Sequence, residues 1–138
     1  MDRLYSILYK SHQHWRYMIF LFAAIAIIAL VVGFFSQKKW RPLGRVSSLL
    51  FVIMVDIQVL IGLVLWFVGE RWKGVDPERS WEHPTIMLLA VALLHVGSVK
   101  AKKGEKEDIL RYKTMLTFAF IATVVILFGV YKITKGLP

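Results

Sequence analysis

The sequence predicts an all-α integral membrane four-helix bundle with both termini on the outer side. Its composition is 57% hydrophobic and its mean hydropathy is +0.59, above the values typical of soluble globular chains. Four apolar runs are separated by polar connections, and a helix of about 20 residues crosses a bilayer core about 30 Å thick. Ten of the 18 Lys and Arg residues lie in the first and third connections, which indicates that these connections are cytoplasmic.

The length of 138 residues predicts a single domain, residues 1–138. Within it, the apolar runs predict four transmembrane helices over about 17–36, 47–69, 83–100 and 114–133. The lipid bilayer is therefore the first expected partner. The net charge of +9 does not indicate nucleic-acid binding, because the basic residues flank the apolar runs, where membrane topology places them.

The first apolar run is expected to stay in the membrane as an anchor. It is too long for the hydrophobic region of a signal peptide, and polar and basic residues follow it in place of a small-residue cleavage site. Residues 2–16 mix apolar and polar positions, and Leu4, Ile7 and Leu8 can share one helical face. We therefore expect an amphipathic lead-in to the first helix.

The second connection ends in two signals for the start of a helix. Asp76 before Pro77 is typical of an N-cap followed by proline in the first helical turn. His83 stands before Pro84 at the start of the third run, and a residue before proline is disfavoured in the helical region. We therefore expect His83 to be a cap or kink residue at the entrance of the third helix.

The five tryptophans are distributed unevenly between the two sides of the membrane. Only Trp40 falls on the predicted inner side. Two interpretations of the others stay open: an interfacial aromatic belt, or the walls of a cofactor or quinone site at the outer end. The outer four are Trp15, Trp66, Trp72 and Trp81.

All four histidines lie at or inside the edges of the apolar runs, where imidazole has little packing value but is a good ligand for haem iron. His12, His14 and His83 share the outer depth. Two imidazoles that face each other across a bundle form a bis-histidine haem site, so we expect His12 and His83 as axial ligands, with His14 as the alternative to His12. The competing interpretation is interfacial histidines that bind headgroups, loops or Glu82.

Arg16 follows His12 by four residues, so both lie on one helix face, and its guanidinium is the expected partner of a haem propionate. His14 is rotated by about 200° from His12, so at most one of the two faces the bundle interior. His95 has no histidine partner at its own depth. The sequence therefore predicts one b-type haem rather than two.

The chain has no cysteine, which excludes disulfides, thiolate catalysis, c-type haem attachment and cysteine-ligated clusters. Any haem is therefore expected to be held non-covalently. The sequence also has no HExxH, Gly-rich phosphate loop or GxSxG motif. Conventional hydrolase or nucleotide chemistry is not expected.

Asp56 and Gln58 fall near the centre of the second helix. An ionisable residue at that depth is costly unless it is paired, solvated or neutral, so we expect Asp56 to face the bundle interior or a cavity. His95 is its most plausible partner, because the two lie within about one helical turn in depth. Asp56, Gln58, His95 and Glu82 are the candidates for handling protons or a quinone. The alternative is a structural hydrogen bond between helices.

Three short motifs resemble those of small four-helix membrane proteins of Bacteroidetes-type bacteria, which are commonly labelled cytochrome b or uncharacterised membrane protein. The position of Asp56 is often histidine in that family, so this chain departs from the pattern and haem ligation from the second helix is not expected. The resemblance implies a haem-binding or electron-transfer role in the bacterial inner (cytoplasmic) membrane. The motifs are His12-x-x-x-Arg16, Asp56-x-Gln58 with Gly62 and Trp66-Phe67, and Glu82-His83-Pro84.

The sequence thus predicts a b-type haem protein that exchanges electrons with the quinone pool or a partner respiratory complex, as an electron-transfer subunit rather than a stand-alone enzyme. Other membrane subunits or further copies of the chain are the expected protein partners, and a quinone is a second candidate ligand. One alternative is a haem-free accessory subunit in which Asp56 and His95 are contacts between helices. A further alternative is a small oligomeric metal or proton transporter built around Asp56.

Overall fold

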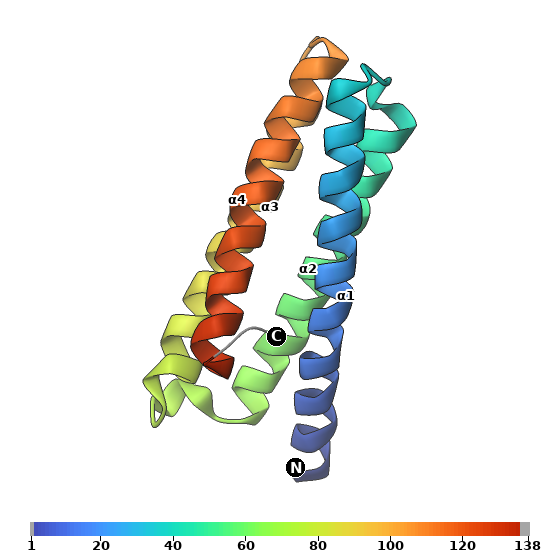
Figure 1. Cartoon of the computed structure of the whole chain (residues 1–138). Helices are drawn as coiled ribbons and strands as arrows, with labels where there is room; N and C mark the ends of the chain where they lie inside the picture. Colours follow the sequence, from blue (N-terminus) through green and yellow to red (C-terminus); the bar gives the residue numbers. More distant parts are fainter. Residues whose placement is uncertain (1, 136–138) are drawn as a thin grey trace.

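The computed structural model describes residues 2–135 as a bundle of four long helices (Figure 1), which confirms the predicted all-α class. Residues 1 and 136–138 of the predicted domain lie outside the described residues. With the short turns that adjoin them, all four helices are long and apolar enough to cross a membrane. They are α1 (Asp2–Phe35), α2 (Arg45–Val68), α3 (His83–Lys102) and α4 (Asp108–Thr134).

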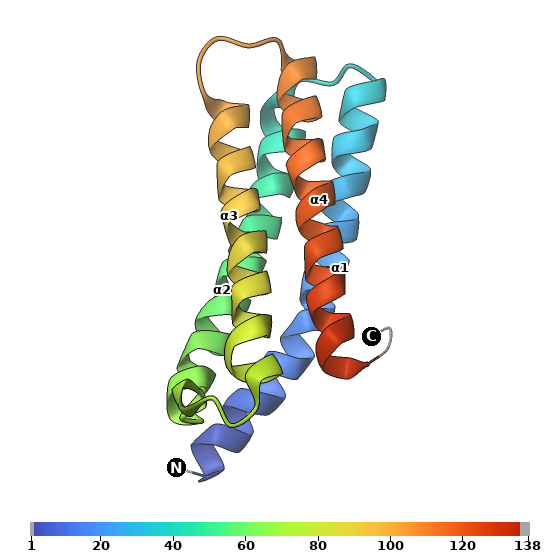
Figure 2. The same ribbon diagram turned by 90° about the vertical axis from the view of Figure 1, so that its left-hand side faces the viewer.

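The helices run alternately up and down, and each packs mainly on its neighbours in the chain, with α4 closing the bundle against α1. The helices α1 and α3 therefore face each other diagonally. Both ends of the described chain lie at one end of the bundle, together with the connection from α2 to α3 (Figure 2). The two basic connections lie together at the opposite end. This arrangement agrees with the predicted topology, in which those connections share one side of the membrane.

The helix α1 begins at Asp2, because the expected lead-in over residues 2–16 is helical and continuous with the apolar run that follows it. Residues 2–16 contain neither proline nor glycine, so no helix breaker separates the polar lead-in from the apolar run. The first turns of α1 project beyond the ends of the other helices (Figure 1). Leu4 and Ile7 are exposed there, while Tyr5 and Tyr9 are partly buried. This longer helix brings two tyrosines to the end of the bundle that carries the histidines.

Near the basic end, a single aromatic side chain joins three elements. Tyr112 of α4 is fully buried, and its hydroxyl donates a hydrogen bond of 2.8 Å to the carbonyl of Lys39. Its ring packs against Trp40, in the short turn η1 (Trp40–Gly44), with ring centres 5.2 Å apart. Trp40 is 5% exposed, so it is a packing residue and not part of an interfacial belt. Tyr112 belongs to α4 because this helix begins at Asp108 and not near 114.

Small residues allow the helices to approach closely in the rest of the core. Alanines supply much of the buried surface of every long helix except α2, as is usual where helices associate in lipid. Two glycines leave no room for a side chain: a Cβ at Gly33 would lie 2.1 Å from the ring of Tyr112, and one at Gly97 would lie 2.4 Å from Cβ of Phe118. The bundle is therefore packed tightly at its basic end and along the α3–α4 contact.

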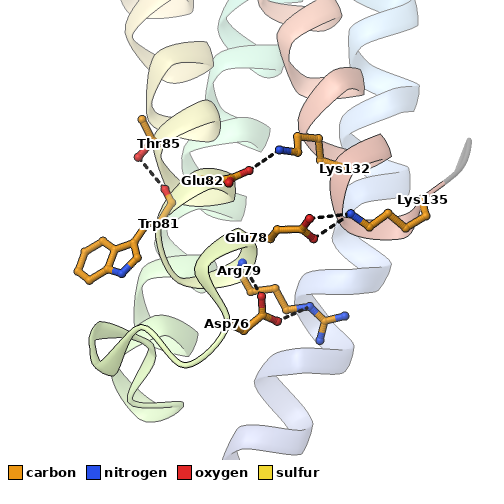
Figure 3. Close-up of polar contacts among 8 residues, drawn as sticks. All are labelled: Asp76, Glu78, Arg79, Trp81, Glu82, Thr85, Lys132 and Lys135. Carbon is orange, nitrogen blue, oxygen red and sulfur yellow. Dashed lines mark hydrogen bonds and ion pairs between the residues drawn. The ribbon is translucent and has the colours of Figure 1, made fainter.

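The second connection contains two short helical turns, η2 (Arg71–Lys73) and η3 (Glu78–Glu82). The carboxylate of Asp76 accepts a hydrogen bond of 3.4 Å from the backbone N–H of Arg79, as the predicted N-cap requires. Ion pairs of Glu78 with Lys135 and of Glu82 with Lys132 attach η3 to the end of α4 (Figure 3).

His83 is helical, with φ −60° and ψ −49°, so of the two predicted roles, cap or kink residue, the non-helical cap is wrong. Its predicted place at the entrance of the third helix is confirmed, because it is the first residue of α3. The turn before it, η3, is a π-helical turn that continues directly into α3. A π turn inside a helix relieves the missing N–H and the steric demand of a proline such as Pro84. His83 therefore lies on the helix itself, with a side-chain direction fixed by the helical backbone.

Candidate functional site

A pocket of about 330 Å³ opens between all four helices at the end of the bundle that carries both chain ends. Its volume lies at the lower end of the range of cofactor sites. Most of its walls are apolar, with a few polar groups placed among them, which is the usual composition of such sites. Those groups are the side chains of Tyr5, Tyr9, His12, Gln13, Arg16, Gln58, Arg71, Arg79 and His83.

His12 of α1 and His83 of α3 face each other across this pocket. Their ring centres are 6.2 Å apart, and the ring planes are nearly perpendicular, at 87°. The contact arises because α1 and α3 are diagonal in the bundle and run in the same direction. Since the first turns of α1 project beyond the other helices, His12, ten residues into α1, lies at the depth of His83, the first residue of α3. The predicted pairing of these two histidines across the bundle is present.

Each imidazole lies beside a backbone carbonyl of a neighbouring helix. The carbonyl of Gln58 lies beside His12, and that of Gly129 lies beside His83. Neither contact reaches hydrogen-bonding geometry at Nδ1, and both Nδ1 atoms are buried without a partner within residues 2–135. Buried polar atoms are normally paired, so two such atoms in one pocket indicate a site whose polar groups serve a ligand.

Gly62 of α2 makes room for the His12 ring. A Cβ at this position would lie 3.0 Å from Cε1 of His12 and 3.5 Å from Nδ1, but 3.9 Å from Nε2. Cε1 is thus the ring atom nearest to this point on α2, and the absence of a side chain at Gly62 leaves the space in which the imidazole lies.

Gln58 belongs to this pocket and not to the Asp56 pair with which the sequence grouped it. Its side-chain amide Nε2 donates a hydrogen bond of 2.8 Å to the carbonyl of His12, which ties α2 to α1 beside the imidazole. Its Oε1 is buried without a partner among the described residues. Gln58 therefore fixes the backbone that carries His12 and leaves one acceptor in the pocket wall.

Three arginines line the pocket, and the sequence predicted only one of them. Arg16 has a buried Nε without a partner in the described chain, while its Nη2 is 3.2 Å from the hydroxyl of Tyr17. Arg71 donates a hydrogen bond of 2.7 Å to Tyr5, and Arg79 is 3.6 Å from the Asp76 carboxylate. Arg71 and Arg79 were missed because they belong to the second connection, whose return over the pocket is not visible in a hydropathy profile.

Two of the residues predicted at the outer end lie outside the pocket. His14 is exposed, and its Nδ1 is 2.7 Å from the carbonyl of Lys10 in its own helix. The geometry therefore supports His12 over His14 as the inward-facing residue. Glu82 points to α4, where it pairs with Lys132 (Figure 3).

Trp66 is the one outer tryptophan that lines the pocket. Its indole Nε1 donates a hydrogen bond of 2.7 Å to the carbonyl of Ser80, and its ring contacts those of Trp72 and Trp81. The latter two are exposed, as residues of an interfacial belt are. Each of the two interpretations of the outer tryptophans therefore applies to some of them. Trp66 forms a wall of the pocket, and Trp72 and Trp81 face outward as in an interfacial belt.

Asp56 and His95 form the predicted pair between α2 and α3. Nε2 of His95 is 2.8 Å and 3.0 Å from the two carboxylate oxygens. The expectation that Asp56 faces the interior is wrong, because the side chains of Asp56 and His95 are 43% and 50% exposed on the outside of the bundle. Small core residues allow α1 and α4 to fill the interior at this depth, so the pair is left on the lipid-facing side of the α2–α3 contact.

No group of three His, Cys, Asp or Glu side chains within residues 2–135 is arranged to hold a metal ion by itself. No protein-family model, curated protein or solved structure matches the chain.

Proposed function

We propose that the chain is a multi-pass membrane protein that binds one b-type haem between His12 and His83 and transfers electrons. The observation that carries the proposal is the separation of the two imidazoles. Since an imidazole nitrogen binds a metal ion at about 2.0 Å and lies about 1.2 Å from its own ring centre, two axial imidazoles have ring centres about 6.4 Å apart. The observed value is 6.2 Å.

The surroundings of the imidazoles fit axial ligation. A ligating histidine usually donates its second N–H to a carbonyl or carboxylate, which sets the ring orientation and its basicity. A backbone carbonyl lies beside each of the two rings without a hydrogen bond to Nδ1, and we propose that each accepts that bond when the ring binds haem. Gly62 keeps space for the first ring. A matched pair of rigid, neutral nitrogen ligands is the usual arrangement for electron transfer, because both axial positions are filled.

The arginines fit the acidic edge of a haem. Propionates need cations or hydrogen-bond donors, and guanidinium matches a carboxylate with two parallel N–H groups. Arg16 offers a buried donor that has no partner among the described residues, and Arg71 and Arg79 lie at the mouth of the same pocket. We propose that Arg16 binds one propionate inside the pocket. We propose that Arg71 and Arg79 contact the propionates at the mouth of the pocket, where the pocket opens to water.

The chemistry that a bound haem supplies is reversible one-electron transfer at iron. The chain contributes an apolar pocket that excludes water, two fixed imidazoles and positive charge near the propionates. Each of these influences the reduction potential. Asp56 and His95 lie outside this pocket, and we propose that they exchange a proton with a quinone headgroup that reaches them from the lipid.

The exposed position of Asp56 and His95 supports a role in contact with another molecule. A charged residue at the bilayer centre costs about 3 kcal/mol on insertion scales, and hydrocarbon offers no hydrogen bonds to reduce that cost. A quinone headgroup, a partner respiratory subunit or a second copy of the chain would each cover the pair. The same observation favours the second candidate function, a haem-free accessory subunit that packs on a membrane complex through α2 and α3. In either case we propose the bacterial inner membrane as the location of the protein.

One spectrum separates the two candidates. The full chain, expressed with sufficient haem and purified in a mild detergent, is measured oxidised and after reduction with dithionite. We expect a Soret band that sharpens and shifts on reduction, with one haem per chain by extraction. A colourless, stably folded protein would refute the haem proposal and leave the accessory role.

A further inference from the structure

A second cavity lies at the basic end of the bundle, opposite the histidine pocket. At this end the connection from α1 to α2 lies near the connection from α3 to α4 (Figures 1 and 2). It has a volume of about 330 Å³ and is formed by η1 and the adjoining ends of α2, α3 and α4. Four cationic side chains contribute to its walls: Lys39, Arg41, Arg45 and Lys102. They come from two connections that are more than 50 residues apart in the chain.

These four charges are not neutralised by the protein. Within residues 2–135, none of them takes part in an ion pair, and Asp108 is the one acidic residue of the cavity wall. A fifth cation, Arg111, is occupied, because it donates hydrogen bonds to the carbonyls of Ala101 and Gly104 at the end of α3. At the other end of the bundle, by contrast, Glu78 and Glu82 are each paired with a lysine. A hollow lined by unpaired like charges attracts an anion.

We propose that this cavity binds the phosphate headgroup of an anionic membrane phospholipid. The forked guanidinium groups of Arg41 and Arg45 suit phosphate oxygens, and basic pockets between transmembrane helices on the cytoplasmic side are known to accept such headgroups.

A lipid is favoured over a soluble phosphate by what lies one helical turn deeper in the membrane. Leu49 follows Arg45 by four residues and is 40% exposed, and Val99 precedes Lys102 by three residues and is 62% exposed. Residues three or four apart share a helix face, so an apolar side chain lies below each of these two cations. The headgroup site thus continues into a surface suited to acyl chains.

The proposal is tested by lipid binding to the delipidated full chain in a neutral detergent, measured by native mass spectrometry. Dioleoyl phosphatidylglycerol is titrated against the zwitterionic dioleoyl phosphatidylcholine. We expect retention of phosphatidylglycerol by the natural chain. Each basic residue near a membrane surface contributes about fivefold to affinity for anionic lipid, so Arg41→Gln with Arg45→Gln should weaken binding about 25-fold.

The matched control neutralises the same number of charges at the same end but outside the cavity, with Lys103→Gln and Lys113→Gln, and should retain the lipid. Lys102→Gln repeats the test from another helix if the double arginine variant does not fold. Equal binding of the two lipids, or an equal loss in the cavity and control variants, would overturn the site. Competition by inorganic phosphate at the concentration of the lipid would show that the cavity takes a soluble anion and would overturn the lipid assignment. None of these measurements depends on haem.

Discussion

Nε2 of His95 lies 2.8 Å and 3.0 Å from the two oxygens of the Asp56 carboxylate, midway along two neighbouring helices and on their lipid-facing side. The pair is thus separate from the pocket, which is lined by all four helices at the end of the bundle that carries both chain ends and includes neither residue. Two sites with different access follow: one enclosed by all four helices, and one reached from the bilayer.

Replacing Asp56 with alanine should affect quinone-linked activity without affecting the haem spectrum. The change leaves His95 without its partner and removes a proton-exchanging group from the lipid-facing surface. We expect the rate of haem reduction by a quinol in liposomes to fall at least about tenfold, the lower part of the range for removal of an acid–base group. Stability should fall by only about 1 kcal/mol, as for other hydrogen bonds between membrane helices.

The control is Thr117→Ala, which removes a side chain whose hydroxyl bonds only to the carbonyl of Lys113 in its own helix. An unchanged rate in Asp56→Ala would restrict the pair to a structural role.

Replacing Gly62 with leucine should displace His12. A Cβ alone would stand 3.0 Å from Cε1 of the imidazole, and the rest of a leucine side chain needs the space that the ring occupies. We expect haem content per chain to fall to a small fraction of the natural value, measured by extraction and absorbance. A full haem content in this variant would mean that His12 is not held against α2 when the protein binds haem.

Replacing Gly97 with alanine should weaken the bundle but leave the pocket intact. Its Cβ would lie 2.4 Å from Cβ of Phe118, so α3 and α4 must separate. Overpacking of this kind typically costs about 1–3 kcal/mol. The free energy of unfolding, measured in mixed micelles with increasing denaturing detergent, should fall by that amount, while the haem spectrum of the folded fraction stays unchanged.

Ala92→Leu, on the exposed side of the same helix, is the matched control and should have little effect. The packing account would be wrong if the two variants were equally stable.

Replacing Arg16 with glutamine should lower the haem reduction potential. A cation near the propionates stabilises the reduced state relative to the oxidised state, which carries one more positive charge. Its removal should therefore lower the midpoint by tens of millivolts, the order expected for one charge at about 10 Å in a partly polar medium. Redox titration followed by absorbance gives the value, and Arg3→Gln, an exposed change on the same helix, should not shift it. A rise in potential would place Arg16 away from the propionates.

The depth of the helices and of the outer histidines could be predicted from sequence because both follow from hydropathy and from a rise of 1.5 Å per residue. The start of α1 could not, since hydropathy reports which residues lie in lipid and not where a helix ends. Tyr5 and Tyr9 were therefore not predicted as pocket residues, because they reach the pocket only through the continuation of α1 to Asp2.

The direction of Asp56 could not be predicted for a different reason. The rule that buried charges face the interior assumes that the interior has room, but small residues such as Ala26 and Ala119 bring the helices together and are fully buried. Gln58 is two residues further on, about 200° around the helix, and it is the residue that faces the pocket. Asp56 and Gln58, which the sequence grouped as candidates for handling protons or a quinone, therefore lie on opposite sides of α2.

The central claim is axial ligation by His12 and His83, and the most direct measurement is the low-temperature electron paramagnetic resonance spectrum of the oxidised protein together with its histidine variants. The natural chain should give a low-spin ferric signal from two nitrogen ligands. His12→Ala and His83→Ala should each abolish that signal, while His14→Ala, two residues from His12 but outside the pocket, should retain it. A low-spin signal that survives in either of the first two variants would contradict the assignment.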